Sequence, residues 1–237
     1  MRKILAISVK ETRSYFASPI AYVVMAMFLL ITGYFFAGFV YDTSLATLSG
    51  LFSTGTIIML MLVSSVLTMR LLAEEQKLGT IELLLTSPVR DVEVVIGKYL
   101  ASLAVFAVML ALTLYYPLLL FWFGDPDAGP IFSGYLGFFL VGASFLAVGL
   151  LASSLTSNQM VSAVLSFGLL MLVWVIAQAS SFVSGTPAQV ITYMALSVHM
   201  GDFVKGVVDT TDIIYYLSFI ALFLFLTVRS LETRRWR

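Results

Sequence analysis

Cysteine is absent from this 237-residue chain, and charged residues are scarce, at 11% of the sequence. The lack of cysteine excludes disulfide bonds, thiolate metal sites and a cysteine nucleophile. Soluble domains carry charge on about a quarter of their residues and are about half apolar, whereas 60% of this chain is hydrophobic. That excess is too large for a globular core, and it indicates an integral membrane protein.

Sequence motifs for nucleotide and metal binding are also missing. The phosphate-binding pattern GxxxxGK[ST] does not occur, because the one Gly-Lys pair, Gly97-Lys98, is followed by Tyr99 and lacks the earlier glycine. HExxH and CxxC are absent, and no Ser/His/Asp motif supports hydrolysis. We therefore predict that the chain is not an enzyme and binds no cofactor or metal ion itself. Its zero formal net charge gives no argument for a nucleic-acid partner.

His199 is the only histidine. Asp202 would lie three residues from it along a helix, and Asp209 could share the same outer face. One interpretation of these three residues is a metal-binding or pH-sensing group. We favour the other interpretation, a surface histidine beside solvated acids, because that is the commoner arrangement of a lone imidazole.

Long intervals of the sequence contain no Asp, Glu, Lys or Arg. The longest, 128–201, exceeds a single span, and its only cluster of small polar residues, SSLTSNQ at 153–159, divides it into a helical hairpin. A membrane barrel would need period-two alternation, which these intervals lack. The sequence therefore predicts one all-α membrane domain over residues 1–237. Its six transmembrane helices are expected at 19–40, 51–70, 97–122, 132–152, 160–182 and 213–230.

The basic residues define an orientation. Six spans place both ends of the chain on one side of the membrane, and twelve of the thirteen lysines and arginines fall on that side. Lys205 is the exception. The positive-inside rule then places both termini and the 71–98 segment in the cytoplasm, with the chain in the cytoplasmic (inner) membrane.

Residues 1–17 precede the first span and form a plausible amphipathic helix. Their basic side chains lie broadly opposite Leu5, Tyr15 and Phe16. This pattern favours a helix at the inner membrane interface over a simple solvated tail.

Residues 184–212 lie between the fifth and sixth spans, on the outer side. Gly201 and Gly206 weaken any long continuous helix there, so one or two short helices are expected. Asp212 is predicted to cap the last span.

The segment 71–91 separates the second and third spans and begins LLAEEQKLGTIELLLTSPV. Thr80 can cap a short helix whose apolar stripe is broken after Ser87 by Pro88, and Asp91 can cap the helix that enters the third span. The stripe consists of Leu78, Ile81, Leu84 and Leu85. Such a helix could rest on lipid or be gripped by another protein, and the residues alone leave both interpretations open.

The whole chain resembles a known family. An N-terminal amphipathic helix, six spans and the stretch RLLAEEQKLGTIELLLTSPVRDVEVVIGKYL between spans two and three resemble the permease subunits of ABC-2 type transporters. The acidic pair, GT-x-E-LLL-T-SPV and the Gly-Lys pair entering span three are the most specific part of the resemblance. KETRSYFASPIAYVV, SVHMGDFVKGVVDTTDIIYYLS and LETRRWR look most like the gliding-motility permeases.

The resemblance implies a permease subunit that forms the membrane pathway and couples ATP hydrolysis to substrate export or flipping. It would dimerise with an identical or a different permease subunit and bind two separate ATP-binding cassette ATPase subunits, which hold ATP and Mg. An accessory membrane subunit with a large extracytoplasmic domain is an additional candidate partner implied by the subgroup.

The resemblance also assigns roles to individual segments. The helix within 1–17 would be the connecting helix, and 71–91 the coupling segment that contacts the ATPase. The residues carried over to that contact are Glu74, Glu75, Gly79, Thr80, Glu82, Leu83, Leu84, Leu85, Thr86, Ser87 and Pro88.

Two other functions stay open at this point. A non-transporting membrane anchor could use the same segment to recruit an ATPase into a motility, signalling or scaffold complex. An ion-coupled carrier is disfavoured, because no predicted span has an ionisable residue at mid-membrane depth. No span carries a charge or motif that specifies a substrate.

Overall fold

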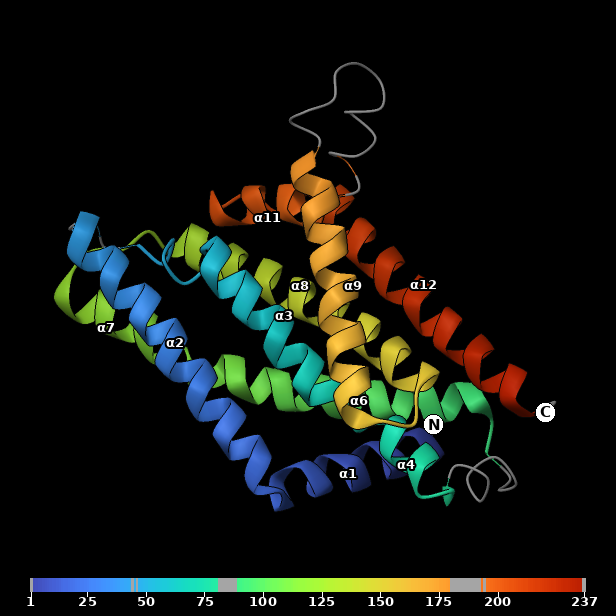
Figure 1. Ribbon diagram of the computed structural model, residues 1–237. Helices are drawn as coiled ribbons and strands as arrows, with labels where there is room; N and C mark the ends of the chain where they lie inside the picture. Colours follow the sequence, from blue (N-terminus) through green and yellow to red (C-terminus); the bar gives the residue numbers. More distant parts are fainter. Residues whose placement is uncertain are drawn as a thin grey trace.

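The computed structural model describes residues 2–43, 45, 47–80, 89–179, 193 and 195–235, and every regular element within them is an α-helix (Figure 1). Six stretches of these residues are long and apolar enough to cross a membrane. The prediction of an all-α integral membrane protein with six transmembrane helices is therefore confirmed.

Each of these six stretches is built on one long helix that overlaps a predicted span. These helices are α2 (Pro19–Thr43), α3 (Thr54–Thr68), α6 (Asp91–Leu112), α8 (Ala128–Leu155), α9 (Gln159–Ala179) and α12 (Thr210–Arg235). The remaining helices are α1 (Arg2–Ala17), α4 (Ala73–Lys77), α7 (Tyr115–Phe123) and α11 (Leu196–Val204).

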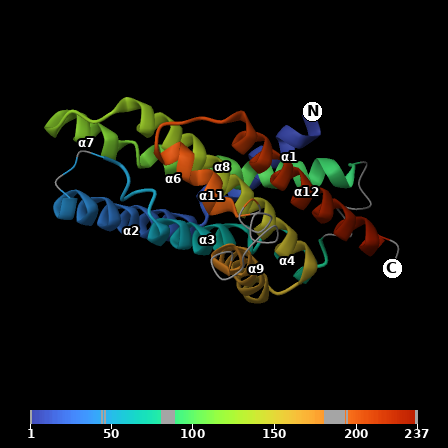
Figure 2. The same cartoon turned by 90° about the horizontal axis from the view of Figure 1, so that it is seen from above.

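Helix α8 is the centre of the bundle. It packs against α3, α6, α9, α11 and α12, and it is the most buried of the six candidate spans. Close contact depends on its glycines: a Cβ atom at Gly142 would lie 2.3 Å from the ring of Phe106, and one at Gly149 would lie 2.1 Å from the hydroxyl of Thr68. Small residues at such crossings are usual in membrane bundles. Figure 2 shows α2 and α12 at opposite sides of the bundle.

The third span bends between α6 and α7, where a continuous helix over 97–122 was predicted. Pro117 has no N–H group, so the carbonyl of Thr113, four residues earlier, loses its helical partner. That carbonyl accepts instead from the Tyr116 N–H at 3.0 Å and from the hydroxyl of Tyr135 on α8 at 2.9 Å. The Thr113 hydroxyl also donates to the Leu110 carbonyl at 2.7 Å. The bend therefore has a local cause and a partner on the central helix.

Two predicted helix caps are wrong. Helix α6 has Arg90 as its N-cap rather than Asp91, and the Arg90 N–H donates to Glu93 Oε2 at 3.0 Å. The start of α12 is capped by Asp209, whose Oδ1 accepts from the Thr211 N–H at 2.9 Å. Asp212 lies within the first turn of α12, and its carboxylate is bound to a histidine instead.

Helices α1 and α11 lie at opposite ends of the bundle (Figure 1). Helix α1 packs along α6, and α11 packs mainly on α8. Of the predicted apolar face of α1, Tyr15 is buried in the protein, whereas Leu5 is 61% exposed.

Candidate functional site

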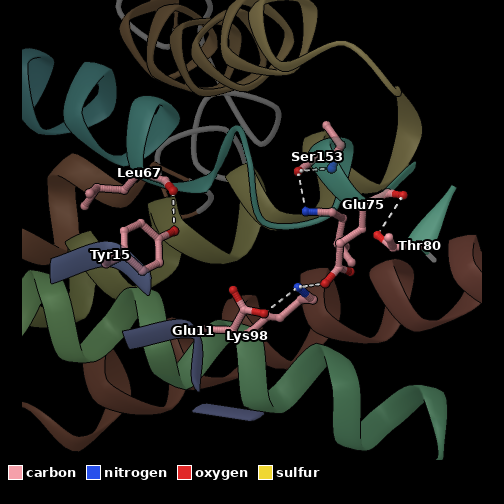
Figure 3. Close-up of polar contacts among 9 residues, drawn as sticks. Glu11, Tyr15, Leu67, Glu75, Thr80, Lys98 and Ser153 are labelled. Carbon is pink, nitrogen blue, oxygen red and sulfur yellow. Dashed lines mark hydrogen bonds and ion pairs between the residues drawn. The ribbon is translucent and has the colours of Figure 1, made fainter. Parts of the chain in front are cut away.

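Helices α1, α4 and α6 meet at one end of the bundle through three charged side chains, which we call the junction: Glu11, Glu75 and Lys98 (Figure 3). Each helix supplies one of them. Lys98 Nζ lies 3.1 Å from Glu11 Oε1 and 2.8 Å from Glu75 Oε1. The side chain of Lys98 is only 1% exposed. One buried ammonium group therefore connects three helices that are distant in the sequence.

The burial of Lys98 explains why its ammonium group needs carboxylate partners. A buried ammonium group is tolerated only when it is paired and hydrogen-bonded, and Lys98 has two carboxylate partners. Two carboxylates and one ammonium leave one negative charge. Glu75 Oε2 is buried and has no hydrogen-bond partner among the residues that the structure describes. Separating any of the three groups would leave a poorly solvated charge, so the junction fixes the relative positions of the three helices.

Gly97 allows α1 to approach α6 beside the junction. A Cβ atom at this position would lie 2.8 Å from Ile7 Cγ2 and 3.2 Å from the carbonyl oxygen of Ile4. Side chains larger than hydrogen would therefore push α1 away from α6. The Gly-Lys pair thus has two structural roles: glycine provides close contact and lysine provides the ion pairs.

Tyr15, one helical turn after Glu11, attaches the C-terminal part of α1 to the bundle. Its hydroxyl donates to the carbonyl of Leu67 near the end of α3. The guanidinium group of Arg70 lies 4.5 Å from the centre of the Tyr15 ring, a cation–π arrangement. Burial raises the pKa of Tyr15, so its phenol stays protonated and remains a hydrogen-bond donor.

Ser153 attaches α4 to the central helix α8. Its Oγ accepts the N–H groups of Leu72 and Ala73, each at 3.0 Å (Figure 3). Gln76 Nε2 also donates to the carbonyl of Ser154 at 2.9 Å. The first amides of a helix have no partner within it, and here a buried hydroxyl of α8 satisfies two of them.

Replacing Ser153 with alanine should lower the free energy of unfolding by about 2 kcal/mol, because two buried amide groups lose their acceptor. Ser144→Ala is a matched control on the same helix, since the buried Ser144 hydroxyl donates only to the Leu140 carbonyl in its own helix. Thermal unfolding of both purified variants in one detergent measures the difference. Equal unfolding temperatures for the two variants would contradict this role of Ser153.

A hollow of about 450 Å³ opens beside the junction. It lies next to Thr80, where the described chain stops before resuming at Val89. Thr80 Oγ1 donates to the Glu75 carbonyl at 3.4 Å. The lining is strongly polar and carries both signs of charge; its residues are Lys10, Glu11, Ser14, Tyr15, Arg70, Leu71, Glu74, Glu75, Leu78, Thr80 and Lys98.

Four of the residues predicted to contact an ATPase lie in the described part of the chain. Glu74 and Thr80 line the hollow, and Glu75 belongs to the junction. Gly79 has a φ of 71°, a left-handed conformation that favours glycine, and it turns the chain after α4. The other seven lie outside the described residues: Glu82, Leu83, Leu84, Leu85, Thr86, Ser87 and Pro88.

Sequence reasoning missed Glu11, Lys98 and Ser153 as parts of this site. In the sequence, the Gly-Lys pair indicates only an incomplete phosphate-binding pattern and part of a family resemblance. Glu11 looks like one of several charged residues on the solvated face of an amphipathic helix. Nothing local in the sequence indicates that these residues meet.

The prediction for His199 is wrong in two respects. The side chain is 6% exposed rather than solvated, and its Nδ1 lies 2.6 Å from Asp212 Oδ1. The two acids that were grouped with it have other partners: Asp202 pairs with Lys205, and Asp209 caps α12. Among the described residues, no group of three His, Cys, Asp or Glu side chains could hold a metal ion.

The protein is thus a multi-pass helical membrane protein in which α1, α4 and α6 are joined at one end of the bundle. Residues 41–229 match the family described as ABC-2 family transporter protein. This match covers most of the chain, and the protein belongs to that family. Glu75 and Lys98 lie within the match, whereas Glu11 precedes it. No curated protein matches the chain.

Proposed function

We propose that this protein is the permease subunit of an ABC-2 transporter, which forms the membrane pathway and couples ATP hydrolysis on separate subunits to substrate export or flipping. Membership of the ABC-2 transporter family supports a role as the membrane component. The sequence has no GxxxxGK[ST] pattern, which agrees with ATP and Mg binding to another chain.

The junction is the observation that supports coupling of ATP hydrolysis to transport through this chain. Segment 71–91 begins with α4, whose Glu75 is bound to Lys98 at the start of the third span. Ser153 joins α4 to the central helix, and Glu11 joins the same lysine to α1. A force applied to residues 80–88 would therefore reach α6, α8 and α1 through directed polar contacts. Such contacts could transmit a shift between two states of the bundle if they differ between those states.

The proposed assembly follows from this role. Two permease subunits, identical or different, would bind two ATP-binding cassette ATPase subunits at the end of the bundle that contains the junction. Both termini would be cytoplasmic and the protein would lie in the inner membrane, as the distribution of basic residues favours. The gliding-motility subgroup and its accessory subunit with a large extracytoplasmic domain are part of the same proposal.

Reversing the character of two residues in the coupling segment tests this function. In the complex with its ATPase subunits, Glu82→Lys combined with Leu84→Glu should reduce permease-dependent stimulation of ATP hydrolysis about fivefold or more, since coupling free energies are about 1 kcal/mol or larger. The measurement compares hydrolysis by the complex in nanodiscs with hydrolysis by the isolated ATPase.

Lys205→Glu is the matched control, because it reverses one exposed charge directly after α11, which lies at the end of the bundle opposite α1. This variant should retain full stimulation. Undiminished stimulation in the double variant, with the protein inserted normally, would refute the proposed coupling contact.

A further inference from the structure

The buried pair His199 and Asp212 lies at the end of the bundle opposite the junction, where α11 meets α12. His199 Nδ1 is 2.6 Å from Asp212 Oδ1, and His199 Nε2 is 2.9 Å from the carbonyl oxygen of Tyr193. The ring of Tyr215 is stacked on the imidazole, with ring centres 4.0 Å apart. One imidazole therefore connects α11, the start of α12 and the chain just before α11.

The two hydrogen bonds of His199 fix the number of protons in the pair. A carbonyl oxygen can only accept, so Nε2 must carry a hydrogen to bond with Tyr193. Nδ1 and Asp212 Oδ1 also need a hydrogen between them at 2.6 Å. A neutral imidazole beside an ionised carboxylate has one hydrogen too few, and it would leave two lone pairs facing each other at one of these contacts. The observed geometry therefore requires one additional proton.

The position of Asp212 favours placing that proton on the imidazole. Asp212 lies in the first turn of α12, where the helix dipole stabilises a negative charge. Its second oxygen, Oδ2, is buried and has no hydrogen-bond partner among the described residues. The histidine is then the main compensation for a buried carboxylate, and removal of its proton would leave that carboxylate poorly solvated.

We infer that His199 and Asp212 form a proton-binding site that holds Tyr193 and α11 against α12 only while the proton is bound. As the pH rises and the proton leaves, one of the two imidazole contacts is lost and the attachment of α11 to α12 weakens. Under the proposed orientation, this site lies on the extracytoplasmic side. The proton site itself does not depend on the proposed transport function.

Among the residues that the structure describes, the titratable side chains whose rings lie against the imidazole are Tyr193, Tyr215 and Tyr216. On α11 itself, Asp202 is exposed and paired with Lys205. The described parts of α8 and α9, which also pack against α11, carry no Asp, Glu, Lys, Arg or His. Loss of the proton at this contact is therefore assigned to the His199–Asp212 pair.

Nitrogen-15 NMR of the full chain tests the site directly, because His199 is the only histidine and labelled histidine gives one ring to observe. The sample requires a purification tag without histidine. Over a titration from about pH 5 to pH 9, we expect hydrogen on both ring nitrogens while the proton is bound, and loss of one hydrogen as the pH rises. A ring with a single hydrogen throughout this range would overturn the proposal.

Two matched variants identify the partner. Asp212→Asn removes the facing charge and should move the loss of the proton to lower pH than in the native chain. Asp202→Asn makes the same change on an exposed acid three residues from His199 and should leave the titration unmoved. If His199 loses its proton at the same pH in the native chain and in Asp212→Asn, Asp212 is not its partner. That result would overturn the proposed pair.

Spin labels measure the attachment of α11 independently. The chain has no cysteine, so Val198→Cys on α11 and Ile214→Cys on α12 place labels at two exposed positions. The distance distribution between the labels should broaden as the pH rises, and this change should be lost when His199→Gln is added. If the distance distribution does not change with pH in the chain that retains His199, the proton does not control the attachment of α11. That result would overturn the proposal.

Discussion

Replacing Lys98 with methionine is expected to lower the free energy of unfolding by about 3 kcal/mol, the lower end of the cost of breaking a buried ion pair. The substitution keeps the length of the side chain but removes the ammonium group that pairs with both Glu11 and Glu75. Two carboxylates that are mostly shielded from water then repel each other. Thermal unfolding of the purified protein in detergent or nanodiscs measures the loss.

Two comparisons separate the ion pairs from other effects of this substitution. Lys205→Met removes a lysine from an exposed pair with Asp202 and should change stability little, because exposed pairs contribute about 0 to 1 kcal/mol. Adding Glu11→Gln and Glu75→Gln to Lys98→Met removes the repulsion and should recover part of the lost stability. A Lys98→Met protein as stable as Lys205→Met would contradict the account of the junction.

Replacing Gly97 with leucine is expected to release α1 from α6 while the central bundle around α8 stays folded. The new side chain would begin 2.8 Å from Ile7 and 3.2 Å from the backbone of Ile4, so α1 must move. Overpacking of this kind costs about 1–3 kcal/mol. Hydrogen exchange of the α1 amides should then become about tenfold faster, since 1.4 kcal/mol corresponds to a factor of ten.

Gly38→Leu is the matched control for this second prediction. Gly38 is also helical, and a Cβ atom there meets nothing within 4 Å among the described residues. Exchange in α1 should be unaffected by that change. Unchanged exchange of α1 in Gly97→Leu would show that close contact at Gly97 does not hold the helix in place.

The spans were predictable because they depend on a local property, the absence of charge over about twenty residues. The hairpin between α8 and α9 falls at the polar stretch 153–159 for the same reason. The bend at Thr113 could also have been predicted, because Pro117 cannot bond to the carbonyl four residues earlier. The partner of the Thr113 carbonyl on another helix, Tyr135, could not be predicted from the sequence.

The junction could not be predicted because burial of a charge is a property of the whole bundle. Lys98 looked like any basic residue at the cytoplasmic end of a span, and only contacts with α1 and α4 make it a buried ion. The prediction for His199 is wrong for a related reason. Its partner is Asp212, thirteen residues away on the next helix, rather than the acids spaced for one shared helical face.

The mass of the intact complex shows whether this chain is the membrane subunit of a transporter whose ATPase is a separate protein. The chain would be purified from its native membranes in several mild detergents, without crosslinking. We expect a complex of two permease subunits and two ATP-binding subunits. Recovery of a stable monomer with no ATPase bound, in all of these detergents, would contradict that expectation.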